Sequence, residues 1–465
     1  FSYRDYRRGG FPDQLLSGVD ILIPAGKRVL VLGPPDSGKS TLSRLLCSLV
    51  PRHAEGTLSG KITIGGKDVR SVAPWELTDV VTMVSQNPQE QLLMTTCADE
   101  VAFPLEALGI DHDKMVERVH RALAAWGLDE LAQVNPQELS GGERKRLLLA
   151  VTEAIDAPVW VMDEPFDDLD EQWRTVLMKR LHEHRRTVLL FASRYLDEFR
   201  GSFDAYGYVG EKRITWRPEE DVVVSFEREC DALFTPKEHQ AGPFGSSRLT
   251  CDGARIVHPR RSTLAAPFAL TVDEFHVDTS EVVALVGPNG CGKSTLSRVL
   301  CGLDPVLEGS ISIDGRTMAS RQLQTRVGYL FQNPDFGIFL PTVRDELSWS
   351  LRHDRTVDHE TRERLATECA RLFHLDLDDN PTMMSYGARK HLQAAVSYML
   401  DRRFVILDEL DSGVTYAGAF EIVMLLRARG AGVVVITHDR SFARNLAERQ
   451  YRIIDGKVIE TEVGE

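Results

Sequence analysis

Six short apolar runs divide the chain into two halves that repeat the same order of features. They are residues 29–32, 159–162 and 187–191 in the first half, and 282–286, 404–407 and 433–436 in the second. Apolar runs of four or five residues are typical of strands buried on both faces of a parallel sheet. The pattern therefore predicts buried parallel strands, and the polar residues that follow each run are candidates for chemistry.

The first apolar run of each half leads into the same glycine-rich motif, GxxxxGK[ST]. It reads Gly33-Pro34-Pro35-Asp36-Ser37-Gly38-Lys39-Ser40 and Gly287-Pro288-Asn289-Gly290-Cys291-Gly292-Lys293-Ser294. In such a loop the backbone N–H groups curl around phosphate, the lysine reaches the outer phosphates and the hydroxyl binds Mg²⁺. Two accidental matches would occur in about one in ten thousand chains of this size. The nucleotide-binding candidates are Gly33, Asp36, Gly38, Lys39, Ser40, Thr41, Gly287, Asn289, Gly290, Gly292, Lys293, Ser294 and Thr295.

Two further motifs repeat at a constant spacing. Leu139-Ser140-Gly141-Gly142-Glu143 corresponds to Met384-Ser385-Tyr386-Gly387-Ala388, and the acid pair Asp163-Glu164 corresponds to Asp408-Glu409. Ser140 and Ser385 lie 245 positions apart, and so do Glu164 and Glu409. A strand that ends in two acids can deliver one carboxylate to Mg²⁺ and the other to water.

Together these motifs resemble those of the ATP-binding cassette (ABC) ATPases, over nearly the whole chain and as two cassettes. The resemblance implies an α/β fold of two RecA-like P-loop cassettes, each with a helical subdomain and a small N-terminal β subdomain. It also implies ATP and Mg²⁺ as cofactors. Two such cassettes close head to tail, so that the P-loop of one and the signature of the other hold each ATP. The expected cassettes are residues 1–216 and 250–465, joined by a polar, Gly/Pro/Ser-rich linker at 217–249.

The family pattern also implies individual roles. Glu409 and Glu164 polarise the attacking water, His438 contacts the γ-phosphate, and an aromatic residue near the start of the cassette, here Tyr3, stacks on adenine. The implied catalytic residues are Glu409, His438 and Glu164; the implied Mg²⁺ ligands, direct or through water, are Ser40, Gln86, Asp163, Ser294, Gln332 and Asp408; the implied signature contacts are Ser140, Gly141, Gly142, Ser385 and Gly387.

The two composite sites implied by this layout are unequal. The site built on Lys293 matches the family throughout, with Asp170 and the Ser140 signature facing it from the first half. The site built on Lys39 collects five departures from the pattern, which random drift would have scattered between the sites. They are Asp36 for a glycine, Ser193 at the position of His438, and Tyr386, Ala388 and Thr415 on the facing half. We therefore expect hydrolysis at Lys293, Glu409 and His438, and mainly ATP-dependent clamping at the other site.

Composition limits the partners. Lys plus Arg number 55 and Asp plus Glu number 69, so the net charge of −14 argues against a protein that wraps nucleic acid. The basic triplet Arg144-Lys145-Arg146 is then interpreted as a solvated helix face or a contact with neighbouring acids. Seven scattered cysteines, without zinc-binding spacing, fit a reduced cytosolic compartment. The apolar runs are too short for a membrane helix. Because Phe1 is not Met, the chain is expected to begin inside a longer polypeptide.

The segments after Gln86 and Gln332 indicate which ABC subfamily the chain resembles. Gln86-Asn87-Pro88 with Asp99-Glu100-Val101, and Gln332-Asn333-Pro334 with Asp345-Glu346, look like the ATPases of energy-coupling-factor (ECF) importers of vitamins and metal ions. The implied partners are a transmembrane coupling subunit, or a coupling domain fused before Phe1, and a substrate-binding membrane component. The resemblance places this chain at the cytoplasmic face of the cell membrane. No nucleic-acid partner is expected. Two alternatives stay open: a soluble tandem ABC protein of ribosomes or repair, and the fused ATPase of a sugar importer.

Overall fold

The chain folds into two compact units, Phe1–Arg228 and Glu229–Glu465. A computed structural model describes residues 1–3, 14–34, 37–50, 52, 56–183, 186–210, 212–223, 245–258, 268–352, 357–437 and 439–463. The predicted site residues Asp36 and His438 lie outside the described residues, as does most of the predicted linker.

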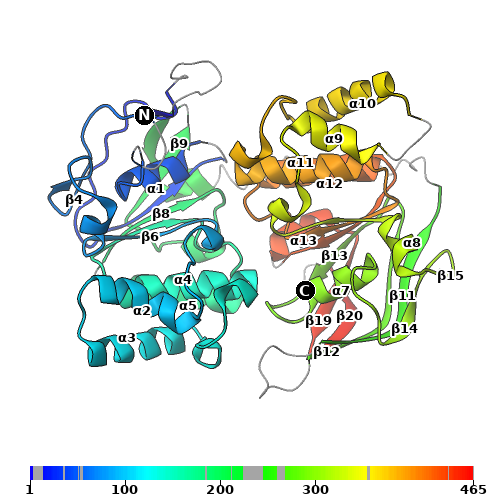
Figure 1. Cartoon of the computed structure of the whole chain (residues 1–465), viewed down its shortest axis with the longest axis horizontal. Coiled ribbons are helices and arrows are strands. Elements are labelled where there is room, and N and C mark those ends of the chain that lie inside the picture. The colour runs from blue at the N-terminus through cyan, green and yellow to red at the C-terminus, as the bar shows by residue number, and fades with distance from the viewer. Residues whose placement is uncertain are drawn as a thin grey trace. The chain divides into compact units, whose positions relative to one another are not determined.

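The first unit is built on a six-stranded sheet in the order β10-β9-β2-β8-β7-β6 (Figure 1). Its strands are β2 (Arg28–Leu32), β6 (Val81–Val84), β7 (Val159–Asp163), β8 (Thr187–Ala192), β9 (Ala205–Gly210) and β10 (Arg213–Arg217). All neighbours pair in parallel except β10 with β9. The predicted runs 29–32, 159–162 and 187–191 are the three central strands and are largely buried, as expected for a sheet covered on both faces.

The second unit repeats this sheet and extends it to ten strands, in the order β15-β14-β11-β12-β20-β19-β13-β18-β17-β16. The repeated part comprises β13 (Val282–Val286), β16 (Val327–Leu330), β17 (Phe404–Asp408), β18 (Gly432–Ile436), β19 (Arg449–Ile454) and β20 (Lys457–Thr461). The added strands are β11 (Arg248–His258), β12 (Phe268–Asp278), β14 (Glu308–Ile313) and β15 (Arg316–Thr317). In the first unit the smaller β elements are two separate pairs: β1 (Ser2–Tyr3) with β3 (Gly56–Thr57), and β4 (Thr63–Ile64) with β5 (Lys67–Asp68).

Each unit has its own group of packed helices, which lies in the sequence between the glycine-rich loop and the acid pair. In the first unit α2 (Cys97–Ala107), α3 (His112–Ala125) and α4 (Gly141–Ile155) contact one another, and Figure 1 shows them together at one end of that unit. In the second unit α9 (Val343–Ser350), α10 (His359–Leu372) and α11 (Tyr386–Met399) form the matching group. The other described helices are α1 (Lys39–Leu46), α5 (Glu171–Glu183), α7 (Lys293–Leu300), α8 (Ser320–Gln324), α12 (Tyr416–Ala428) and α13 (Arg440–Leu446). Both units therefore have the α/β core and the helical subdomain of an ABC cassette.

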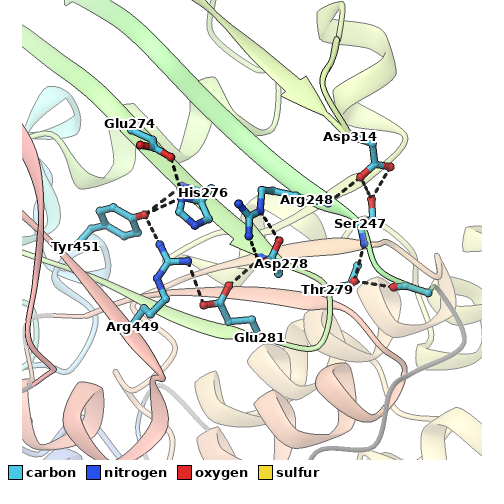
Figure 2. A network of polar contacts seen from close by, with 11 residues as sticks. Ser247, Arg248, Glu274, His276, Asp278, Thr279, Glu281, Asp314, Arg449 and Tyr451 are labelled. Atoms are coloured by element: carbon cyan, nitrogen blue, oxygen red, sulfur yellow. Dashed lines mark hydrogen bonds and ion pairs between the residues drawn. The ribbon is translucent and has the colours of Figure 1, made fainter.

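Polar contacts fix the added strands of the second unit against its parallel core (Figure 2). Arg248, at the start of β11, forms a bidentate ion pair with Asp278, at the end of β12, with both N–O distances 2.7 Å. The Asp278 backbone N–H donates to Glu281, which also pairs with Arg449 at 3.3 Å. Because Arg449 opens β19, the network joins two antiparallel strands to the strand beside β13.

Within the described part of the chain, no helix has the length and apolar character needed to cross a bilayer.

Candidate ATP sites

Strand order brings the predicted motifs of each unit to one edge of its sheet. In the first unit β8 lies between β2 and β7, and in the second β18 lies between β13 and β17. These strands are parallel, so their carboxyl ends meet at the same edge, where open α/β sheets bind ligands. The P-loop follows β2 or β13, and the acid pair follows the end of β7 or β17.

The two glycine-rich loops have the same conformation around their lysines. Lys39 Nζ donates to the carbonyls of Gly33 (2.6 Å) and Pro34 (2.8 Å), and Lys293 Nζ donates to those of Gly287 (2.7 Å) and Pro288 (3.0 Å). Each lysine opens a helix, α1 or α7, whose free N–H groups favour an anion.

A glycine is required before each lysine. Gly38 has φ +99° and Gly292 has φ +111°, a left-handed conformation that side-chain-bearing residues adopt only at a cost. The adjoining predicted residues Ser40, Thr41, Ser294 and Thr295 lie in the first turns of the two helices, and Asn289 and Gly290 lie in the second loop.

Tyr3 lies beside the first P-loop helix. Its hydroxyl is 3.1 Å from the Thr41 Oγ1, and its ring meets that of Phe1 edge-on at 4.8 Å. Its predicted role in stacking on adenine stays a prediction.

The acids of the first unit are deeply buried. Asp163 is 2% exposed, and burial raises its pKa, while a hydrogen bond from Ser40 and the charge of Lys39 oppose that rise. Glu164 is 6% exposed; burial, and then the Asp167 carboxylate, raise its pKa to about 8, although a hydrogen bond to Ser193 acts in the opposite direction. Ser193, at the position where a histidine was expected from the repeat, is therefore among the groups that act on the pKa of the predicted catalytic acid.

The second unit surrounds its acids differently. Burial, and then repulsion by Glu409, raise the pKa of Asp408 to about 6, while hydrogen bonds to Tyr329 and Ser294 lower it. The Tyr329 hydroxyl donates to Asp408 Oδ2 at 2.5 Å, and Met83 occupies the equivalent place in the first unit. Gln332 Nε2 donates to Glu409 Oε2 at 2.7 Å. Gln86 and Gln332 each begin the loop after an apolar strand that the family pattern names the Q-loop, so the predicted Q-loop and catalytic residues of this unit are in contact.

The donor set fits a magnesium ion. Asp163 Oδ1 is buried without a hydrogen-bond partner, and Ser40 is among the groups that lower the pKa of the same carboxyl. A hard cation takes oxygen ligands of this kind and completes its shell with water and substrate phosphates. Asp408 and Ser294 form the matching pair in the second unit.

The signature segments begin helices in both units. Ser140 caps α4 in a reciprocal box with Glu143, whose carboxylate accepts from the Ser140 N–H at 2.8 Å. Ser385 caps α11 by accepting from the Ala388 N–H at 3.2 Å, and Ala388 has no carboxylate to return the bond. Gly387 is held by packing, since a Cβ there would lie 2.8 Å from the Gly413 carbonyl oxygen.

A buried lysine on each signature helix was missed by the sequence analysis. Lys145 is fully buried, and its ammonium donates to the carbonyls of Ser85 (3.2 Å), Gln86 (2.9 Å) and Glu164 (3.2 Å). Lys390, 245 positions later, donates to the Glu409 carbonyl. The interpretation of Arg144-Lys145-Arg146 as a solvated face was therefore wrong for its central residue, which is buried and donates to backbone carbonyls. The alternative, a contact with neighbouring acids, agrees with the electrostatics: burial lowers the pKa of Lys145, and the charges of Asp168 and Asp167 oppose that fall. The shared spacing to Lys390 was the available signal.

Lys145 and Lys390 each donate to the carbonyl of a residue with a strained backbone conformation. Glu164 and Glu409 have φ of +48° and +49°, a conformation that costs a non-glycine residue about 1 kcal/mol or more. In each unit the carbonyl of this glutamate accepts from the buried lysine, and its N–H donates to the end of the neighbouring strand, at Phe191 or Ile436. These two bonds offset the strain and fix the backbone of the predicted catalytic glutamate.

Asp170 and Thr415, which lie at matching positions after the acid pairs in the segments that the family pattern names D-loops, both cap helices. Asp170 accepts from the Trp173 N–H at 3.1 Å, and Thr415 accepts from the Gly418 N–H at 3.0 Å. The loss of the acid in the second half therefore preserves capping, because threonine is also a good N-cap.

The chain matches the family model described as "ABC transporter" over residues 16–167 and 270–412. A putative ABC transporter ATP-binding protein of Streptomyces coelicolor is 31% identical over 521 residues, covering 97% of this chain and 91% of that protein. One from Treponema denticola is 28% identical, covering 98% of this chain and 95% of that protein.

Two solved structures share the tandem fold. An archaeal ribosome recycling factor, aABCE1, in complex with the stalk protein aP1, gives a TM-score of 0.61 at 18% identity, covering 97% of this chain and 86% of that chain. A protein titled RNase-L Inhibitor gives a TM-score of 0.60 at 19% identity, covering 95% of this chain and 88% of that one. At these identities the likeness shows the fold alone.

Proposed function

Because this chain belongs to the ABC transporter family and is an ATPase, we propose that it is the motor of an importer of the energy-coupling-factor type, for a vitamin or a metal ion. In this proposal residues 1–216 and 250–465 are two cassettes joined by 217–249. They lie at the cytoplasmic face of the membrane, bound to a transmembrane coupling subunit or domain that works with a substrate-binding membrane component. The curated relatives carry the name of transporter ATP-binding proteins, in agreement with a transport role.

Two pairs of exposed apolar side chains, at matching positions in the two halves, are the observation that supports binding to a membrane partner. Leu93 and Phe339 are 246 positions apart, the same spacing as between Gln86 and Gln332, and so occupy equivalent places in the two halves. They are 74% and 78% exposed. Phe103 and Trp349, at the same spacing, are 50% and 52% exposed. Large apolar side chains exposed at the same places in both cassettes indicate a partner that contacts both.

The loop that carries each first residue is held in place by a buried acid. Glu100, on α2, accepts from the N–H groups of Leu93 (2.8 Å) and Met94 (2.7 Å). Glu346, on α9, accepts from those of Phe339 and Leu340. Both glutamates are almost fully buried. The chain therefore uses a charge-assisted contact to fix a loop that presents an apolar side chain outward, which supports a binding surface rather than incidental exposure.

Co-purification tests this proposal. Leu93→Ser combined with Phe339→Ser should release integral membrane proteins that co-purify with the wild-type chain from detergent-solubilised membranes. Trp75→Ser combined with Leu307→Ser is the matched control, since Trp75 and Leu307 are 76% and 64% exposed outside the Q-loop segments. Sedimentation of the wild type with ribosomes, and no membrane partner, would contradict the importer and favour the soluble alternative.

We further propose that hydrolysis occurs at the composite site of Lys293, Glu409 and His438, faced by the Ser140 signature. Lys293 and the loop N–H groups neutralise the outer phosphates, Glu409 polarises the attacking water, and the signature N–H groups stabilise the far side of the phosphate. Ser294 and Asp408 would hold Mg²⁺, which would supply further charge neutralisation when bound. The contacts of Asp408 with Tyr329 and of Glu409 with Gln332 support an ordered set of acids in this cassette.

At the other composite site, built on Lys39, ATP mainly holds the cassettes together. Ser193 replaces the histidine there, and a serine offers neither the reach nor the charge of an imidazole. ATP binding closes the two cassettes, and hydrolysis at the Lys293 site releases them.

A further inference from the structure

A tyrosine occupies the third position of the second signature, where the first cassette has Gly141. Tyr386 is the first residue of α11, and its hydroxyl donates a hydrogen bond of 2.7 Å to the backbone carbonyl of Gln332. The sequence identifies this residue only as a departure from the family pattern. The structure adds a partner for the side chain within its own cassette.

Gln332 connects this contact to the catalytic acid. Its side-chain Nε2 donates to Glu409 Oε2 at 2.7 Å, while its backbone carbonyl accepts from Tyr386. Lys390 donates to the Glu409 carbonyl and lies 5.2 Å from the centre of the Tyr386 ring. The start of α11 therefore holds the Q-loop backbone, and the Q-loop side chain in turn holds the catalytic carboxylate.

The first cassette makes the corresponding link without a tyrosine. Lys145 donates to the Gln86 carbonyl at 2.9 Å and also to the Glu164 carbonyl at 3.2 Å. Gly141 has no side chain that could reach the Q-loop. In both cassettes the signature helix donates a hydrogen bond to the Q-loop of the same cassette. In the first cassette the donor is Lys145, and in the second the hydroxyl of Tyr386, at the first helical position, is a donor.

We propose that Tyr386 is a positioning residue for the ATP site built on Lys293. Its hydroxyl restrains the loop after β16, so that Gln332 keeps the Glu409 carboxylate in one orientation toward the attacking water. Restraint of this kind lowers the reorganisation needed before the reaction and acts on turnover more than on ATP affinity. The inference rests on the proposed assignment of hydrolysis to this site.

The test compares Tyr386→Phe with Tyr398→Phe, a control in the same helix. Both are measured in a Glu164→Gln background, which isolates turnover at the Lys293 site. Phe keeps the ring beside Lys390 and removes only the hydroxyl. We expect Tyr386→Phe to lower kcat about fivefold, the effect of one hydrogen bond, and to change KM for ATP less than about twofold. Tyr398→Phe should leave both constants unchanged, and thermal unfolding verifies that both variants are folded.

Two results would overturn the proposal. A kcat equal to that of the control would show that the hydroxyl does not position the site, and an increased kcat would show that its hydrogen bond to Gln332 holds the site away from the reactive arrangement. Failure of the underlying assignment is recognised separately. If Glu409→Gln and Glu164→Gln lose turnover equally, then hydrolysis is not confined to the Lys293 site, whatever Tyr386→Phe does.

Discussion

Lys145 offers a measurable test of how the ATP site is held together. Lys145→Met replaces the ammonium by an apolar end of similar length and leaves the carbonyls of Ser85, Gln86 and Glu164 without their shared donor. The Glu164 carbonyl still accepts from the Asp167 N–H at 3.2 Å, whereas each carbonyl left without a partner costs about 1–3 kcal/mol. Part of this is recovered, because the fully buried ammonium no longer has to be desolvated; that same burial lowers the pKa of Lys145.

The expected net loss is about 3 kcal/mol of unfolding free energy, or a fall in Tm of roughly 6–12 °C for a unit of this size. Tryptophan fluorescence during urea unfolding suits the measurement, because residues 75, 126, 160, 173 and 216, five of the six tryptophans, lie in the first unit. Lys179→Met is the matched control, since Lys179 is on an exposed face of α5, where its i,i+4 pair with Glu183 is worth little. An unfolding free energy of Lys145→Met within about 0.5 kcal/mol of that of Lys179→Met would refute this reasoning.

Three further perturbations separate the two acid clusters. Tyr329→Phe removes a hydrogen bond that lowers the pKa of Asp408, so the acid limb of the pH–kcat profile should move up by about half a pH unit or more; an unmoved limb would contradict the assignment. The folded chain keeps a proton on Glu164 up to its pKa of about 8, and the stability from this group is lost as the pH rises through that value. Relative to the wild type, Glu164→Gln should therefore gain stability as the pH rises from 4.5, the ordinary pKa of a glutamate, to about 8 in EDTA, and a difference that stays constant over this range would argue against the raised pKa. Arg194→Met leaves the buried Asp167 carboxylate, 3.1 Å away, without its ion pair and should cost about 3 kcal/mol in urea unfolding; Arg194→Met with Asp167→Asn should recover much of the loss, and equal losses would exclude the pair as the cause.

The parts of the fold predictable from sequence were those set by local patterns. The apolar runs 29–32, 159–162, 282–286 and 404–407 are strands, because an uninterrupted apolar run has few alternatives to burial in a parallel sheet. The same runs located the P-loops and acid pairs, since parallel strands bring their carboxyl ends to one edge.

The missed residues depend on contacts between distant segments. Lys145 lies in a charged triplet that is typical of a solvent-exposed helix face, yet the packing of α4 against β6 and the Q-loop buries it. Tyr329 belongs to an ordinary apolar strand, and only the pairing of β16 with β17 brings its hydroxyl to Asp408. Tyr386 was recognised as a departure, but its contact with Gln332 spans 54 positions and leaves no local signal.

Steady-state ATPase measurements on Glu409→Gln and Glu164→Gln, with His438→Ala and Ser193→Ala as a second pair, test the central claim of unequal sites most directly. All four variants keep the P-loops, so nucleotide binding serves as a control in each. We predict that Glu409→Gln and His438→Ala abolish turnover, while Glu164→Gln and Ser193→Ala retain a substantial part of it. Equal losses within both pairs would contradict the assignment of hydrolysis to the Lys293 site.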